Sequence, residues 1–167
     1  MQTPVCSICL KSGFLCQGCE SKIKDGKISE LDVKVARALF ELSKKHKGLD
    51  QLVFKRSIDS EGLVILIVGE GQIPLLVGKR GRLIQEVEHL LDTRIRVIEQ
   101  GASTRKIAED IVAPAEVLGV NVLYAKTGEQ YRLRVARHQA KLLPGSRENV
   151  QQALNVLTDK NFAIVFE

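Results

Sequence analysis

Apolar residues recur at helical spacing in one early segment of the chain. They fall on a single face, at intervals of three and four residues: Leu31, Val35, Leu39 and Leu42. Ser29 precedes them as an N-cap residue and Asp32 follows it three residues later, which is a variant of the capping box. The pattern predicts an amphipathic helix from Ser29 to about Lys45.

Two predicted strands follow this helix and are separated by a polar turn. They cover residues 49–58 and 63–68, and Asp59-Ser60-Glu61-Gly62 between them has the composition of a hairpin turn. The second run is apolar throughout, as the central strand of a sheet would be. A short helix and a longer one, ending near Leu91, then precede a third strand at 93–99.

The second half of the chain repeats this order. Its predicted elements are a helix at 104–111, strands at 119–125 and 130–137, a short helical piece at 139–143, a helix at 147–157 and a strand at 163–166. An offset of 66 residues places Ile84 on Val150. Each half has the order α-β-β-α-α-β, so we expect an α+β protein with two duplicated units, at 28–100 and 101–167.

The chain has four cysteines, and all of them lie in its first 19 residues. Cys6 and Cys9 form one C-x-x-C pair, and Cys16 and Cys19 form a second. Two such pairs supply the four thiolate ligands of a tetrahedral metal site. We therefore expect residues 1–27 to form a small module with a structural Zn²⁺ ion, which would stabilise a segment too short to fold alone.

Two other uses of these cysteines stay open at this point. Four cysteines also ligate iron–sulfur clusters. Two disulfides are disfavoured because the first residues have no basic segment followed by an apolar one, so no signal peptide is expected. No apolar run approaches the ~18 residues of a transmembrane helix. We expect a cytoplasmic protein without membrane contact.

Charge and composition narrow the functional classes only slightly. The 167 residues carry a formal net charge of +5, spread as +2, +1 and +2 over 1–27, 28–100 and 101–167. No polybasic arm is present, so nucleic-acid binding would depend on local placement of charge. Aromatic residues make up 4% of the chain, which argues against single-strand binding by stacking on aromatic platforms.

A basic glycine loop joins the two predicted helices of the first unit. Gly78 and Gly81 flank Lys79 and Arg80, and Arg82 follows at the start of the longer helix. Glycine also serves helix-to-helix turns for geometry alone. A Gly-x-x-Gly turn between two helices, with basic residues inside it, is however the device with which KH domains hold the backbone of about four nucleotides. We expect single-stranded RNA to bind at Gly78, Lys79, Arg80, Gly81 and Arg82.

Three stretches of the chain resemble a known family. They are residues 76–84, around the glycine loop, residues 94–99 (Arg-Ile-Arg-Val-Ile-Glu) and residues 113–122 (Ala-Pro-Ala-Glu-Val-Leu-Gly-Val-Asn-Val). Together they resemble the tandem type II KH region of the transcription factor NusA. Two KH units without further domains are similar to archaeal NusA-like proteins. The resemblance covers roughly 28–167 and implies RNA binding tied to transcription elongation or termination.

The second unit departs from the KH pattern at its loop. Pro144-Gly145-Ser146-Arg147 stands where a second Gly-x-x-Gly motif is expected. Proline lacks an N–H donor and Arg147 places a side chain where close approach is needed, so this loop should bind phosphate poorly. Arg147 and Lys141 remain candidates for secondary RNA contacts, as do Arg132 and Arg134 on the strand before them. For that last pair, the solvated face of an antiparallel strand is the favoured explanation.

No group of side chains forms a catalytic constellation, so no enzymatic activity is expected. Three functions compete. The first is a NusA-like regulator of transcription, with RNA polymerase as its protein partner. The second is a KH factor that acts on ribosomal RNA or mRNA, with the ribosome as its partner. The third is a protein-interaction adaptor that docks through its zinc module.

Overall fold

The computed structural model describes all residues, 1–167, in two compact units. One unit consists of residues 1–59 and 64–100, and the other of residues 60–63 and 101–167. Each unit contains a three-stranded sheet, so the predicted α+β class is confirmed. None of the helices is long and apolar enough to cross a membrane.

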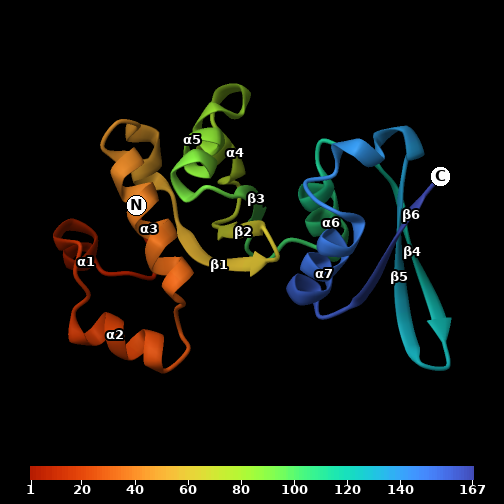
Figure 1. Ribbon diagram of the computed structural model, residues 1–167, viewed down its shortest axis with the longest axis horizontal. Coiled ribbons are helices and arrows are strands. Elements are labelled where there is room, and N and C mark those ends of the chain that lie inside the picture. The colour runs from red at the N-terminus through yellow and green to blue at the C-terminus, as the bar shows by residue number, and fades with distance from the viewer. The chain divides into compact units, whose positions relative to one another are not determined.

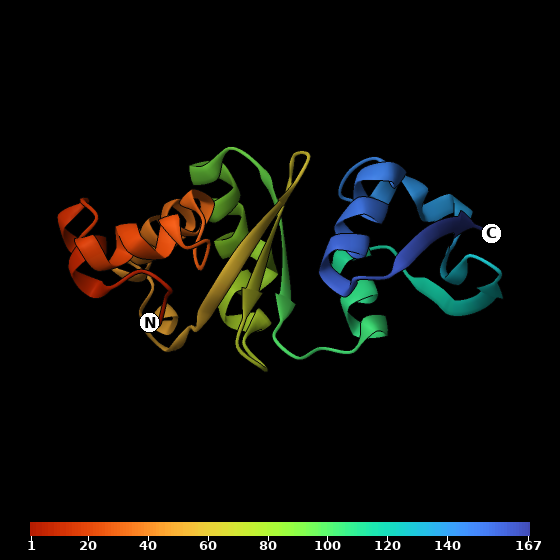
Figure 2. The ribbon, with the colours of Figure 1, turned by 90° about the horizontal axis from the view of Figure 1, so that it is seen from below.

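The first unit has three strands in the order β1-β2-β3, with β2 in the centre, as its apolar sequence predicts. Helices α3, α4 and α5 cover one face of this sheet (Figure 2). The elements are α1 (Ser7–Ser12), α2 (Gln17–Lys24), α3 (Glu30–Ser43), the 3₁₀ turn η1 (Lys47–Gln51), β1 (Phe54–Ser60), β2 (Leu63–Val68), α4 (Ile73–Val77), the 3₁₀ turn η2 (Lys79–Gly81), α5 (Arg82–Leu91) and β3 (Arg94–Glu99).

The second unit has a sheet of the order β4-β5-β6, with β4 antiparallel and β6 parallel to β5. Helices α6 and α7 lie on one face of this sheet (Figures 1 and 2). The elements are α6 (Thr104–Val112), β4 (Val117–Ala125), β5 (Gly128–Val135), the 3₁₀ turn η3 (Arg137–Leu142), α7 (Arg147–Thr158) and β6 (Asn161–Phe166).

The structure corrects several predicted boundaries. Residues 47–51 form a 3₁₀ turn, and β1 starts only at Phe54 and extends through Ser60. The reason is local, because Gly48 and Asp50 favour a turn while Leu49 still buries its side chain. The cysteine segment contains two short helices, α1 and α2, and Gly18 lies inside α2 without a positive φ.

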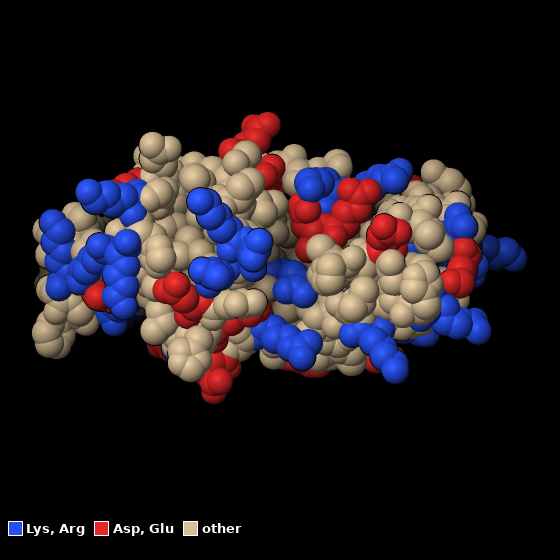
Figure 3. All heavy atoms as spheres, turned by 90° about the horizontal axis from the view of Figure 1, so that it is seen from above, with Lys and Arg blue, Asp and Glu red and all other residues tan.

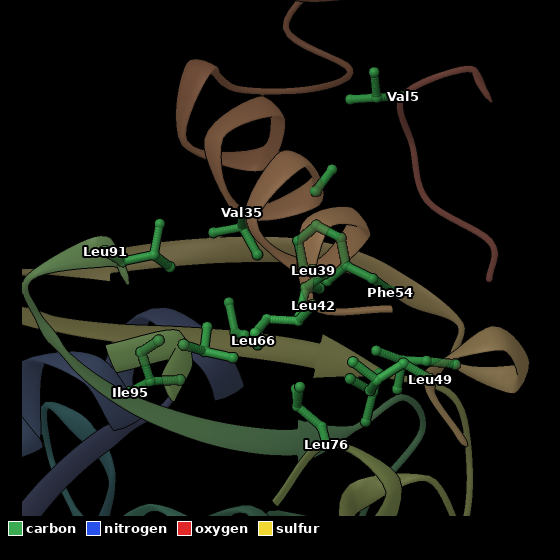
Figure 4. Packing of buried hydrophobic residues seen from close by; sticks show 14 of the residues in the cluster. Val5, Val35, Leu39, Leu42, Leu49, Phe54, Leu66, Leu76, Leu91 and Ile95 are labelled. Atoms are coloured by element: carbon green, nitrogen blue, oxygen red, sulfur yellow. The ribbon is translucent and has the colours of Figure 1, made fainter. Parts of the chain in front are cut away.

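One hydrophobic cluster fills the first unit. Val35, Leu39 and Leu42 of α3 meet apolar side chains from the sheet, including Leu66 of β2 and Ile95 of β3 (Figure 4). The cluster also contains residues of the cysteine segment: Val5, Cys9 and Cys19. That segment therefore packs on the same core as α3.

A buried carboxylate ties α3 to β1. Asp32 completes the predicted capping box, since its Oδ2 accepts the backbone N–H of Ser29 at 2.9 Å and its own N–H donates to the Ser29 hydroxyl at 3.0 Å. Its Oδ1 accepts both the backbone N–H and the hydroxyl of Ser57, each at 2.6 Å. The carboxylate is buried and fully hydrogen-bonded, which explains why the core tolerates it.

The two units repeat the same helix-to-strand contact at an offset of 67 residues. Glu88 Oε1 accepts the backbone N–H of Ile95 at 2.8 Å, and Asn155 Oδ1 accepts that of Phe162 at 2.7 Å. Asp92 is the C-cap residue of α5 and has a left-handed backbone conformation. Asp159 has the same conformation at the C-cap of α7, again 67 residues later. The offset of 66 inferred from the apolar pattern is therefore wrong by one residue in this region.

Candidate metal centre and nucleic-acid interface

The two C-x-x-C pairs have the same local structure. Cys6 is the N-cap of α1 and Cys16 the N-cap of α2, so the second cysteine of each pair lies in the first turn of a short helix. The same backbone bond closes both turns, from the N–H of Leu10 to the carbonyl of Cys6 and from that of Glu20 to Cys16. Each pair thus directs two sulfur atoms to one side of a turn.

The four sulfur atoms converge on one point in space. All the Sγ atoms lie within 4.8 Å of one another, with Cys6 3.3 Å from Cys9 and 3.9 Å from Cys16. None of them is in a disulfide. Four thiolates around a tetrahedral zinc ion, at Zn–S distances of about 2.3 Å, are about 3.8 Å apart. The cysteines therefore fit a tetrahedral metal ion with only small adjustments.

Backbone donors surround these sulfurs. The N–H of Cys16 donates to Sγ of Cys9 at 3.1 Å, and that of Cys19 to Sγ of Cys16 at 3.4 Å. A hydrogen bond from the backbone of Cys9, followed by one from its thiol, lowers the pKa of Cys6 to about 7. The backbone of Cys19 is the largest of the contacts that lower the pKa of Cys16. These donors favour the thiolate form that metal ligation requires.

Cys9 is the exception among the thiols. The backbone N–H of Cys16 lowers its pKa, but burial and the three neighbouring thiols outweigh that contact and raise the pKa to about 12. A cation at the centre of the cluster would remove this penalty, because it offsets the repulsion between four thiolates. The arrangement thus suits a closed structural metal site.

The glycine loop of the first unit is built from unusual backbone conformations. Gly78, Arg80 and Gly81 all have positive φ, of 73°, 54° and 71°. A Cβ atom at Gly78 would lie 2.7 Å from Cβ of Leu83, so no other residue fits there. The N–H of Gly81 donates to the carbonyl of Gly78 at 3.4 Å, and α5 starts directly afterwards without a side-chain cap.

The basic side chains of this loop are free of acidic partners. Lys79, Arg80 and Arg82 are all exposed, and none of them forms an ion pair. Arg82 also lines a groove of about 520 Å³ between α3 and α5, together with Lys45, Glu86 and other residues. The loop brings the five predicted residues together at the open N-terminus of a ten-residue helix. Backbone donors and positive charge at such a point favour an anion.

The second unit places its candidate residues differently. Arg132 and Arg147 line a groove of about 670 Å³ between β5, β6, η3 and the start of α7. Arg137, which sequence reasoning missed, lines it as well, and no acidic residue does. Arg137 begins η3 two residues after the end of β5, where the alternation of the strand no longer applies, so no periodic signal could have identified it.

The other two candidates of this unit lie outside that groove. Arg134 forms an ion pair with Glu167 at 2.7 Å, and this contact raises the pKa of the guanidinium and lowers that of the carboxyl. Lys141 is exposed on η3 and does not line the groove. On the face shown in Figure 3, basic side chains form separate groups among acidic ones rather than one continuous surface.

Comparison with known proteins shows the fold alone. No family model and no curated protein matches this chain. Among the solved structures it is similar to the crystal structure of APE1850, with a TM-score of 0.54 and 20% identity over 79% of this chain and 96% of the other. At this identity the likeness concerns the course of the backbone.

Proposed function

We propose that this chain is a single-stranded RNA-binding protein, in which a structural Zn²⁺ ion is held by Cys6, Cys9, Cys16 and Cys19. Both units are of the type II KH kind in this proposal. Their element order and the parallel pairing of β6 with β5 support it. The observation that carries it is the loop 78–81, which combines three positive-φ residues, an uncapped helix start and unpaired basic side chains.

The loop acts through position and charge. Its glycines let a phosphate approach the backbone closely, and Lys79 and Arg80 neutralise that phosphate. The neighbouring bases would then be read by hydrogen bonds to their edges, which needs no aromatic platform. One such site binds weakly. The groove of the second unit that Arg132, Arg137 and Arg147 line, here called the arginine groove, would add to the affinity for an RNA that contacts both the loop and this groove.

The biological process follows from the resemblance to NusA. We propose that the protein acts in the cytoplasm as a regulator of transcription elongation or termination, with RNA polymerase as its partner. Capture of RNA polymerase by the tagged full chain supports this role, and capture of ribosomal particles contradicts it.

The decisive variant is Lys79→Asp/Arg80→Asp, because substitution of either glycine would disturb the backbone itself. Its matched control is Lys55→Asp/Arg56→Asp on β1, a second exposed Lys-Arg pair without ion pairs. Both variants change the net charge equally. Binding of labelled single-stranded RNA pools is measured across a salt series, after circular dichroism has shown that both variants fold.

We expect at least a tenfold loss of affinity in the loop variant and little change in the control. A plot of the logarithm of the association constant against the logarithm of the salt concentration has a negative slope. In the loop variant this slope should become less steep by about 1.4, which is about 0.7 for each of two lost phosphate contacts. Equal losses of affinity in both variants would mean that binding depends on the overall charge of the protein and not on this loop. If the wild type binds no RNA at all, the proposal is wrong, and the exposed Ile8 and Phe14 of the cysteine segment make the adaptor role the next to test.

A further inference from the structure

The arginine groove lies within the second unit, and all its charged residues are basic. Its three arginines come from separate elements: Arg132 from β5, Arg137 from the start of η3 and Arg147 from the first turn of α7. All three are exposed, and none of them forms an ion pair. Like charges that share one groove repel each other, so an anion bound among them would stabilise the arrangement.

A neighbouring arginine on β5 is neutralised within the chain, whereas the arginine of the groove is not. Arg134 and Arg132 lie on the same face of the strand, since they are two residues apart. Arg134 forms its ion pair with Glu167 at 2.7 Å. Beside Arg132 the strand register places Ala163 of β6 and Asn121 of β4, which are both uncharged. The charge of Arg132 thus stays available for a ligand.

The backbone beside this groove lacks the features of the loop 78–81. Residues 144–147 have no positive φ, and the hydroxyl of Ser146 already accepts the N–H of Asn149 at 3.1 Å. Binding of an anion here therefore depends mainly on the guanidinium groups. Each guanidinium is a planar fork of N–H donors, which matches the oxygens of a phosphate group.

Three guanidinium groups match a terminal phosphate better than a phosphate inside an RNA chain. An internal phosphate carries one negative charge and has two free oxygens, because the other two are esterified. A terminal phosphate carries a charge of about −1.5 to −2 at neutral pH and has three acceptor oxygens. The groove, of about 670 Å³, is in the size range of pockets that hold whole small ligands, so it also has room for the attached nucleotide.

We propose that the arginine groove binds the terminal phosphate of an RNA chain. This inference rests on the proposed RNA binding and adds to it. The loop 78–81 binds internal phosphates through its backbone, and the arginine groove binds the phosphorylated end through Arg132, Arg137 and Arg147. The ligand class is a phosphate monoester on a nucleotide. Both an RNA end and a free nucleotide carry this group, and the experiment distinguishes them.

The test compares short single-stranded RNAs of one sequence that carry a 5′-phosphate, a 3′-phosphate or no terminal phosphate. Isothermal titration calorimetry measures the affinity of each RNA for the full chain. We expect the wild type to bind one of the phosphorylated RNAs about tenfold more tightly than the unphosphorylated RNA, which is the effect of one charge-assisted hydrogen bond. The variants Arg132→Gln, Arg137→Gln and Arg147→Gln should each remove most of this gain in affinity.

Three further variants separate the groove from charge in general and from the loop. Lys126→Gln removes an exposed charge without an ion pair from the same unit, outside the groove, and should keep the full gain. Arg132→Lys keeps the charge but loses the planar fork, so it should reduce the gain. Lys79→Asp/Arg80→Asp should bind all three RNAs more weakly and still prefer the phosphorylated end.

Equal affinities of the wild type for the three RNAs would overturn this proposal and leave the RNA site at the loop 78–81 unaffected. A preference for the phosphorylated end that survives all three glutamine variants would overturn it as well. If the wild type binds none of the RNAs, the proposed function is wrong together with this inference. Circular dichroism of each variant separates loss of binding from loss of folding.

Adenosine monophosphate, added as a competitor, distinguishes the two sources of the phosphate. We expect it to displace the phosphorylated RNA only in large excess, because it makes no contact with the loop. Displacement at equal concentration would assign the groove to a free nucleotide and would contradict binding of an RNA end.

Discussion

The two units build the start of the same helix in different ways. In the first, α5 follows Gly81 without a side-chain cap, after a loop with three positive-φ residues. In the second, Ser146 caps α7 by accepting the N–H of Asn149 at 3.1 Å, and residues 144–147 contain no positive φ. The fold therefore does not require the glycine loop. Because a serine cap suffices for structure in the second unit, the uncapped basic loop of the first unit supports the proposed phosphate site.

The units also differ in what stabilises them. The first includes the cysteine segment and a buried carboxylate, whereas the second has neither. In the second unit, helix α6 has a simple N-cap: the hydroxyl of Ser103 accepts the N–H of Lys106 at 3.2 Å. This contrast predicts how each unit responds to loss of metal and to substitution.

Removal of the proposed metal ion should give the largest effect, and this effect should be confined to the first unit. Binding of zinc by short peptides contributes on the order of 10 kcal/mol, so the segment 1–27 should unfold when a strong chelator is added. Limited proteolysis with and without the chelator, followed by mass spectrometry, locates the cuts. New cuts in 101–167, or none at all, would show that the metal does not have this role.

The buried carboxylate should matter more than the simple cap. Asp32→Ala leaves three donors of Ser29 and Ser57 without an acceptor, and we expect a loss of about 3 kcal/mol in the free energy of unfolding. Ser103→Ala at the corresponding helix start should cost about 1 kcal/mol. Urea unfolding of both variants measures these two losses. Equal losses in the free energy of unfolding would show that the buried carboxylate contributes no more than a simple N-cap.

The glycines of the two loops should differ in the same way. Gly78→Ala places an alanine at a positive φ, with its Cβ 2.7 Å from the Cβ of Leu83. We expect this change to lower the free energy of unfolding by about 2 kcal/mol. At Gly145 φ is not positive and the nearest atom is 3.8 Å from an added Cβ, so alanine there should change stability by less than about 1 kcal/mol. Thermal unfolding of both variants provides the comparison. An alanine that leaves the stability unchanged at Gly78 would contradict the conclusion that only glycine fits there.

The smallest expected effect is the pH dependence of the ion pair in the second unit. The hydrogen bond from Arg134 lowers the pKa of Glu167 in the folded state, against a partial desolvation. The stabilisation is therefore present at neutral pH and is lost as the pH falls through this lowered pKa. Because both side chains are exposed, Glu167→Gln should be only slightly less stable than the wild type at pH 6, and this difference should shrink as the pH falls through the lowered pKa of Glu167. A difference in stability that grows as the pH falls would contradict a lowered pKa of Glu167.

The local signals in the sequence were sufficient for part of this structure. The capping box at Ser29, the central strand 63–68 and the spacing of the cysteines all depend on neighbours within a few residues. The contact of Asp32 with Ser57 spans 25 residues, and the groove around Arg137 joins four elements. Such contacts depend on how the chain packs, which no local pattern encodes. The one-residue error in the repeat has a similar origin, because α7 is two residues longer than α5.

The proposed function depends above all on binding of phosphates by the backbone of the loop 78–81. An NMR titration of the labelled full chain with a short single-stranded RNA tests it directly, since each amide reports on its own surroundings. We expect the largest shifts at the amides of residues 78–82, with smaller ones along the groove of the second unit that Arg132, Arg137 and Arg147 line. Shifts that leave residues 78–82 unchanged while the RNA binds elsewhere would contradict it.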